Sequence, residues 1–236
     1  LRDSEVEGLI AMRGGYGCLR LLEQVDPDLV RHNPKLIVGF SDITVLQNYL
    51  LKETGLISLH GPVVNSLGSV SKESLTSFFN CLTGNWEGVH VFAHLEILRD
   101  SSLAKGVMAG GNLASLITLL GTRFDSLWDD KIIFLEDTNE PEYKLDRMLT
   151  QLKLAGKFDR LAGLILGDFS SDTLQDDIAR LRYREMVWDR VLELCEGSDF
   201  PIWGNFPAGH CRGNHTFPLG AMAAMDGATG QLTFSK

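Results

Sequence analysis

The sequence lacks several features that would place it in a specialised class of protein. It has no run rich in lysine or arginine, and its 22 basic against 31 acidic side chains give a net charge of −9. A phosphate backbone repels a chain of this sign, so nucleic acid is not expected as a partner. No apolar run approaches the roughly 20 residues that cross a bilayer, and the first residues are too polar for a signal-peptide core. We therefore expect no membrane partner and a cytoplasmic location.

Cysteine is scarce, and no C-x-x-C pair is present. The four cysteines are Cys18, Cys81, Cys195 and Cys211. Their wide spacing favours reduced, packed thiols over a disulfide framework. His210, Cys211 and His215 stand too close together for the usual spacing of a zinc site, so neither a metal nor another cofactor is expected. The sequence also has no internal repeat, and its 44% apolar content is ample for the core of one or two domains.

Short apolar runs alternate with helical patterns over the first sixty residues. Strands are predicted over 6–12, 36–40 and 56–59, with helices over 18–24 and from Asp42 to a capping Gly55. The second strand is apolar throughout, which is typical of a strand buried on both faces. This alternation predicts βαβ units in a parallel sheet, and hence an α/β fold whose first domain is Rossmann-like.

The second half of the chain predicts a mixed β/α domain. Strands are expected over 106–111, 131–135, 161–166 and 202–206, helices over 113–120, 141–154 and 176–195, and a closing hairpin over 219–225 and 231–234. Residues 67–105 are less regular apart from a helix over 72–82. We therefore place a first domain over 1–66, a linker region over 67–105 and a second domain over 106–236.

Three polar residues stand at strand ends or in glycine-rich turns. Ser41 follows a buried strand and precedes a helix, where open α/β sheets place their sites and where unpaired N–H groups suit a developing anion. Together with Glu136 and His210 it has the composition of a nucleophile, an acid and a base. Each also has a structural explanation, namely a helix N-cap, a solvated carboxylate and a hydrogen-bonded loop histidine. Asp42 could itself be the cap.

The commonest template of a serine hydrolase does not fit this corner. The nucleophile elbow G-x-S-x-G needs a glycine two residues after the serine, and Ile43 stands at that position. The chain is therefore not expected to be an ordinary α/β-hydrolase.

Eight short blocks of residues nevertheless occur in a fixed order along the chain. They are Arg13-Gly14-Gly15-Tyr16-Gly17, Asn33-Pro34-Lys35, Gly39-Phe40-Ser41-Asp42-Ile43-Thr44, His60-Gly61-Pro62, Gly110-Gly111-Asn112-Leu113, Leu135-Glu136-Asp137, Tyr143 with Asp146-Arg147-Met148-Leu149, and Gly209-His210 with Asn214 and Pro218-Leu219-Gly220. This pattern resembles the LD-carboxypeptidase family of serine peptidases, which includes the microcin C immunity hydrolases. The resemblance covers essentially the whole chain.

The resemblance implies the architecture of the site and the roles of its residues. It implies a Rossmann-like domain with the nucleophile, a C-terminal mixed β/α domain of the swivelling type with acid and base, and a site in the cleft between them. On this sequence Ser41 is similar to the nucleophile of the family, Glu136 to its acid and His210 to its base. The backbone N–H of Asp42, with that of Gly14 or Gly15, would form the oxyanion hole, since glycine lets a backbone approach a ligand closely.

The resemblance also implies a function and a substrate. The expected reaction is removal of the terminal D-alanine from a muropeptide tetrapeptide during peptidoglycan recycling. An immunity-type hydrolase, which cleaves aminoacyl-sulfamoyl adenylates, is one alternative, and an aromatic such as Trp86 or Trp128 would then stack on adenine. A non-catalytic binding protein on the same scaffold is another. Relatives are commonly dimers, so a homodimer is possible.

Recognition of the substrate leaves several residues open. Arg13 or Arg212 could bind the terminal carboxylate with a bidentate guanidinium, although a structural ion pair is the default interpretation of either residue. Asn112 could bind substrate or cap a helix. Members of the family have a further strand and helix ahead of the position of Leu1, which implies an incomplete first domain, with an unpaired sheet edge and exposed apolar surface.

Overall fold

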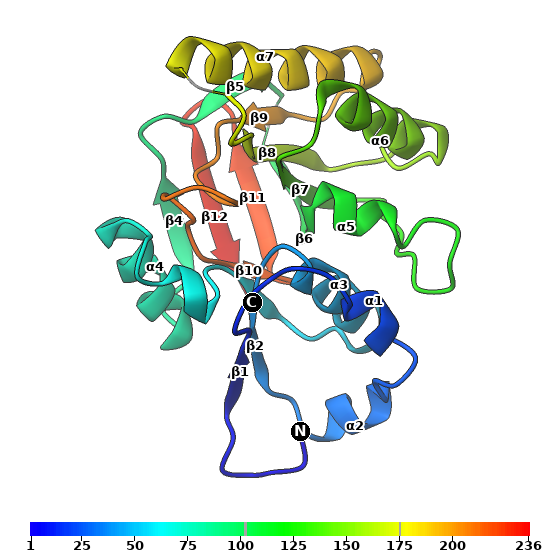
Figure 1. Cartoon of the computed structure of the whole chain (residues 1–236), viewed down its shortest axis with the longest axis vertical. Coiled ribbons are helices and arrows are strands. Elements are labelled where there is room, and N and C mark those ends of the chain that lie inside the picture. The colour runs from blue at the N-terminus through cyan, green and yellow to red at the C-terminus, as the bar shows by residue number, and fades with distance from the viewer. Residues whose placement is uncertain (102, 175) are drawn as a thin grey trace.

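The computed structural model describes residues 1–101, 103–174 and 176–236. Within these residues the strands form two sheets, one in the order β1-β2-β3-β10 and one in the order β4-β12-β11-β6-β7-β8-β9-β5. Figure 1 shows the smaller sheet with α1, α2 and α3 in the lower part of the molecule and the larger sheet above it, beneath α6 and α7. The architecture is the mixed α/β fold expected from the sequence.

The smaller sheet begins as three parallel strands. Its elements are β1 (Gly8–Ile10), α1 (Cys18–Leu21), α2 (Pro27–His32), β2 (Leu36–Gly39), α3 (Ile43–Thr54) and β3 (Ser58–His60). The fourth strand, β10 (Phe217–Leu219), comes from near the end of the chain and pairs antiparallel with β3, with Phe217 opposite His60. The His60 ring stacks on Phe217, and burial, with a smaller effect of His210, lowers the pKa of His60 to about 3, so that the ring packs in its neutral form.

The larger sheet has a parallel centre and antiparallel flanks. Its strands are β4 (Gly88–Val91), β5 (Glu96–Arg99), β6 (Ala104–Asn112), β7 (Lys131–Thr138), β8 (Gly163–Ser170), β9 (Ile202–Gly204), β11 (Met222–Asp226) and β12 (Gln231–Ser235). The strands β6 to β9 are parallel, and β11 and β12 form the predicted hairpin. Residues 67–105, expected to be a linker region, contain the helix α4 (Lys72–Leu82) and the strands β4 and β5, both of which belong to this sheet. A short 3₁₀ turn, η1 (Val64–Ser66), comes just before this region.

The core lies on both faces of the larger sheet. Along β7, Ile133 and Leu135 pack into the apolar cluster on the side of α5 (Leu113–Ile117), α6 (Glu142–Leu154) and α7 (Asp177–Leu194). The alternate residues Ile132 and Phe134 pack into the cluster on the opposite face. Successive side chains of a strand point to opposite faces, so a strand covered on both sides reads as an unbroken apolar run. This is why the sequence predicted it so clearly.

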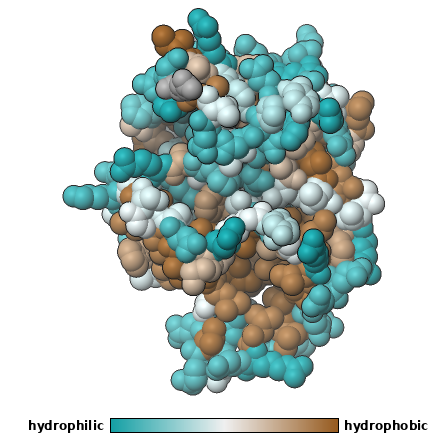
Figure 2. Space-filling model, viewed as in Figure 1, coloured by the Kyte–Doolittle hydropathy of each residue, from teal (hydrophilic) through white to brown (hydrophobic). Residues whose placement is uncertain are grey.

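The strand β1 lies at one edge of the smaller sheet and exposes apolar side chains. Leu9 is 43% exposed and Ile10 is 40% exposed. Figure 2 shows apolar surface gathered over this lower part of the molecule. The apolar edge expected from the sequence is therefore present at β1. Among the described helices, none combines the length and the hydropathy that a bilayer-spanning segment requires.

Candidate active site

Ser41 occupies a tight corner between β2 and α3. Its φ of 64° lies in the left-handed region, which a residue with a side chain adopts at a cost. Two glycines make room for the corner. A Cβ on Gly39 would lie 2.9 Å from Ile43, and a Cβ on Gly14 would lie 2.8 Å from the Cβ of Ser41. Ile43, found where the common elbow has a glycine, is accommodated because Gly39 has no side chain.

Asp42 connects this corner to the glycine-rich turn after β1. It stands at the N-cap position of α3, but its carboxylate does not cap that helix. Instead its Oδ2 accepts a hydrogen bond of 2.9 Å from the backbone N–H of Cys18. The turn formed by residues 13–17 is thereby held beside Ser41.

Glu136 and His210 form a short, buried pair. The His210 Nδ1 lies 2.6 Å from Glu136 Oε2, and the Glu136 side chain is fully buried. Gly209 has a φ of 113°, and a Cβ there would meet Glu136 Oε2 at 2.7 Å, so the loop needs glycine to bring His210 onto the carboxylate. With Nδ1–H donating to Glu136, the other ring nitrogen, Nε2, is available as an acceptor.

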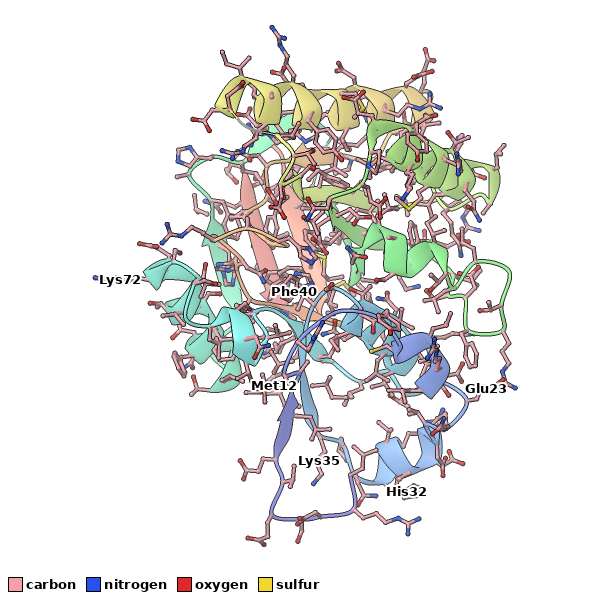
Figure 3. The ribbon with its side chains drawn as sticks, viewed as in Figure 1. Met12, Glu23, His32, Lys35, Phe40 and Lys72 are labelled. Atoms are coloured by element: carbon pink, nitrogen blue, oxygen red, sulfur yellow. The ribbon has the colours of Figure 1, made fainter. Side chains whose placement is uncertain are left out.

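The charges around His210 favour its protonated form. Burial lowers the pKa of the imidazole, but the hydrogen bond and the charge of Glu136 outweigh this effect, with further support from Asp137 and Asp168. The pKa of His210 is therefore raised above its ordinary value. The ring also packs on Phe40, with centroids 4.8 Å apart. Phe40, labelled in Figure 3, lies where the lower and upper parts of the molecule meet.

A cavity of about 430 Å³ brings most of the predicted site residues together, and we call it the Ser41 cavity. Its lining includes Ser41, Asp42, Gly15, Asn112, Asp137 and His210. Gly14 packs against Ser41, and Glu136 holds His210, so both contact residues of this lining. No hydrogen bond joins Ser41 to His210 within the described residues. Catalytic contacts of this kind often form only when substrate binds.

Arg13 does not join this group. Its Nε donates to the carbonyl of its neighbour Gly14 at 3.2 Å, and the side chain is not among those that line the Ser41 cavity. Among the described residues, the arginine that does line it is Arg20, whose guanidinium stands over the ring of Tyr16. The sequence reasoning missed Arg20, since one arginine in a short helix carries no distinguishing signal.

Asn112 both caps a helix and contacts a second carboxylate. Its Oδ1 accepts from the N–H of Ser115 at 3.0 Å, which confirms the predicted cap of α5. Its Nδ2 donates to Asp137 at 3.1 Å. Burial and the nearby charge of Glu136 raise the pKa of Asp137 to about 7, although hydrogen bonds from Thr138, Ala114 and Asn112 oppose the rise. Asp137 was named only within a sequence block, and the structure places it in the lining of the Ser41 cavity.

Two buried polar residues of α3 fasten the helix of Ser41 to the larger sheet. The Asn48 side chain accepts from the N–H of Gly110 at 3.1 Å and donates to the carbonyl of Gly110 at 2.9 Å. Thr44 Oγ1 accepts from the N–H of Asn112 at 3.1 Å. Asn112 lies directly opposite Glu136 in the pairing of β6 with β7. This clamp, formed by Thr44 and Asn48, therefore links the helix that follows Ser41 to β6, the strand that pairs with the Glu136 strand β7.

Two tryptophans considered for nucleobase stacking lie in the core. Trp86 is 7% exposed and Trp128 is 4% exposed, and neither lines the Ser41 cavity. In the part of the chain that the structure describes, no group of three or more His, Cys, Asp or Glu side chains could hold a metal ion.

The fold and the cavity together define a class of enzyme. A buried carboxylate holds a histidine at the wall of a cavity that also contains a serine in a strained corner. This is the arrangement of a serine-type hydrolase.

Comparison with known proteins identifies the family. Residues 1–61 match the LD-carboxypeptidase N-terminal domain, and residues 105–225 match the LD-carboxypeptidase C-terminal domain. A probable murein peptide carboxypeptidase of Bacillus subtilis is 34% identical over 235 residues, which cover 96% of this chain and 71% of the relative. The chain therefore belongs to the LD-carboxypeptidase family, as its motifs predicted, and is a serine-type carboxypeptidase.

Solved structures agree with this assignment. The muramoyltetrapeptide carboxypeptidase of Oxalobacter formigenes superposes with a TM-score of 0.80 at 30% identity, covering 100% of this chain and 81% of that one. An MccF-like protein of Bacillus anthracis superposes with a TM-score of 0.86 at 27% identity, covering 99% and 77%. The chain is thus similar both to carboxypeptidases and to MccF-like proteins.

Proposed function

We propose that this protein is a muramoyltetrapeptide carboxypeptidase, which releases the terminal D-alanine from muropeptide tetrapeptides during peptidoglycan recycling in the cytoplasm. The observation that carries the proposal is the Ser41 cavity, which Ser41 and His210 both line while Glu136 holds His210 at 2.6 Å. The relatives named for murein peptides support the choice of substrate. The partner is then a small peptide or muropeptide, and a homodimer stays a prediction.

The three side chains have complementary tasks in the proposed reaction. The Ser41 hydroxyl attacks the amide carbonyl while His210 Nε2 takes its proton. Glu136 holds the imidazole in the required tautomer and stabilises the imidazolium that forms. The proton then passes to the amine of the departing D-alanine, and water releases the acyl group from Ser41 by the same steps in reverse.

The charge that develops on the carbonyl oxygen needs hydrogen-bond donors. Within the described part of the chain, the backbone N–H groups of Asp42, Gly14 and Gly15 donate no hydrogen bond. They are therefore free to bind an oxyanion beside Ser41, and each such donor contributes about 2.7–4 kcal/mol to transition-state stabilisation. The close packing of Gly14 on Ser41 supports this assignment.

Hydrolysis of an aminoacyl-sulfamoyl adenylate is the second candidate. The likeness to an MccF-like protein and the ring of Tyr16, which is 85% exposed at the Ser41 cavity, favour it. The burial of Trp86 and Trp128 removes the two aromatics proposed from the sequence for nucleobase stacking, which favours the muropeptide.

One experiment separates these functions. The protein and its Ser41→Ala variant are incubated with a stem tetrapeptide and with an aminoacyl-sulfamoyl adenosine, and product masses are followed. We expect D-alanine release by the wild type and a loss of at least about 10³-fold in the variant. Ser4→Ala, at an exposed position outside the cavity, is the matched control. Release that survives Ser41→Ala would refute the nucleophile, and binding without release would indicate a non-catalytic binding protein.

A further inference from the structure

A second cavity shares His210 with the Ser41 cavity. It has a volume of about 280 Å³ and is lined by side chains that include Phe40, Val70, His210, Arg212 and Asn214. We call it the Arg212 cavity. Phe40 immediately precedes Ser41 and packs on the His210 ring, so this cavity lies directly beside the reacting groups.

The proposed reaction needs two spaces that meet at the imidazole. The Ser41 Oγ–carbon bond forms, the carbon–nitrogen bond breaks, and the leaving amine takes the proton that His210 received from Ser41. The acyl part therefore stays at Ser41, while the leaving amino acid must touch His210. Among the residues that the structure describes, His210 alone contributes to the lining of both cavities.

We propose that the Arg212 cavity is the leaving-group subsite, in which the guanidinium of Arg212 pairs with the free carboxylate of the terminal amino acid. This inference rests on the proposed function and assigns its carboxylate-binding residue. A planar guanidinium donates two parallel hydrogen bonds to a carboxylate, which gives both affinity and orientation.

Arg212 is free to bind an anion and stands on a well-fixed loop. Among the described residues, no carboxylate forms an ion pair with its guanidinium, and the side chain is exposed. Its carbonyl accepts from the N–H of Ser71 at 2.7 Å, and Asn214 Oδ1 accepts from the N–H of Gly209 at 3.0 Å. These bonds fix both sides of the loop that carries His210 and Arg212.

The size and the walls of the cavity indicate a small residue. Its volume is below the roughly 300–1,000 Å³ of sites for drug-sized ligands. Phe40 and Val70 offer apolar contacts to a short aliphatic side chain such as the methyl group of alanine. Arg13, the other arginine considered from the sequence, lines neither cavity and folds back onto Gly14.

The test compares two tetrapeptides that differ only in the terminal group, a carboxylate in one and a carboxamide in the other. The wild type should have the higher kcat/KM for the carboxylate. Arg212→Met should lower kcat/KM for the carboxylate substrate by about 10- to 100-fold, as expected for a lost hydrogen bond to a charged group. It should leave kcat/KM for the carboxamide substrate within about threefold of the wild-type value, so that the preference for the carboxylate disappears. Arg212→Lys should restore part of the preference because the charge remains without the planar fork.

Arg13→Met is the matched control, since it removes another exposed arginine near the site. It should keep the preference of the wild type. The subsite would be overturned if Arg212→Met lowered kcat/KM equally for both substrates or kept the wild-type preference for the carboxylate. It would also be overturned if the wild type had no such preference, or if Arg13→Met rather than Arg212→Met abolished it. Thermal melting of each variant checks that the fold is intact. A wild type that releases no amino acid from either peptide would refute the proposed function itself, and the subsite with it.

Discussion

Replacing Glu136 by glutamine tests the proposed mechanism at its most buried point. Glu136 is fully buried, and its Oε2 accepts from the Nδ1–H of His210 at 2.6 Å. A glutamine has nearly the same shape but no charge. It cannot turn away easily, because Gly209 packs against this carboxylate so closely that a Cβ would lie 2.7 Å from Oε2. The carboxamide can therefore point its NH₂ group at His210 Nδ1, which leaves the hydrogen of the ring on Nε2. The alternative is to bury the NH₂ group at the position of the other carboxylate oxygen.

The expected loss follows from the tautomer and the charge. With the wrong tautomer, Nε2 carries a hydrogen and cannot take the proton of Ser41. In other serine peptidases the equivalent change lowers kcat by about 10⁴-fold, which corresponds to about 5.5 kcal/mol of transition-state stabilisation. We expect a loss of this order in Glu136→Gln.

The pH dependence gives an independent measurement. His210 must be neutral to act as a base, so the rate of the wild type rises with pH through the pKa of His210, which is raised above its ordinary value. In Glu136→Gln the main influence that raises this pKa is gone, while burial, which lowers it, remains. The acid limb of kcat/KM for D-alanine release should therefore move to lower pH.

Two results would contradict this reasoning. The first is a Glu136→Gln variant whose kcat stays within about tenfold of the wild type. The second is an acid limb at an unchanged pH, measured with a variant whose melting curve is still cooperative. Either outcome would show that Glu136 does not orient or charge His210 during the reaction.

Two further predictions concern the placement of Ser41. Gly14→Ala should lower kcat by at least about 100-fold because its Cβ would lie 2.8 Å from that of Ser41, while Gly68→Ala, with nothing within 4 Å, should have little effect on D-alanine release. Thr44→Val should lower kcat with KM within about threefold of the wild type, since it removes the acceptor of the bond from Asn112, and Thr44→Ser should restore kcat. The control is Gln47→Met, which breaks a hydrogen bond to β3 rather than to β6 and should lower the melting temperature without this loss of kcat. Equal losses of kcat in Thr44→Val and Gln47→Met would argue against a positioning role of Thr44.

The sequence predicted most of the fold because the signals were local. Buried strands such as β7 are continuous apolar runs, and α3 ends at Gly55, which adopts the left-handed conformation expected of a C-cap. The helix α2 was missed although Asp26 and Pro27 are a typical N-cap and first residue. The strand β10 was missed because it is three residues long and contains Pro218, which weakens the strand signal in a sequence. It lies at the edge of the smaller sheet, where proline is tolerated.

The candidate site was predictable only in part. Ser41, Glu136 and His210 stand at the ends of elements, where polar residues after apolar runs attract attention. The clamp formed by Thr44 and Asn48 depends on how α3 packs against β6, which joins residues far apart in the sequence. Arg13 and Arg212 looked equivalent in the sequence, and only the cavity lining distinguishes them.

The antiparallel pairing of β10 with β3 has a consequence for the order in which the molecule is assembled. Ser41, Glu136 and His210 all precede Phe217, the partner of His60 in that pairing. A growing chain therefore contains every reactive side chain before the sheet beneath Ser41 receives its last strand. Closing so long a loop costs entropy that only the finished contacts repay. Activity is thus expected to appear late in synthesis, when β10 completes the smaller sheet, and not when the last reactive side chain is added.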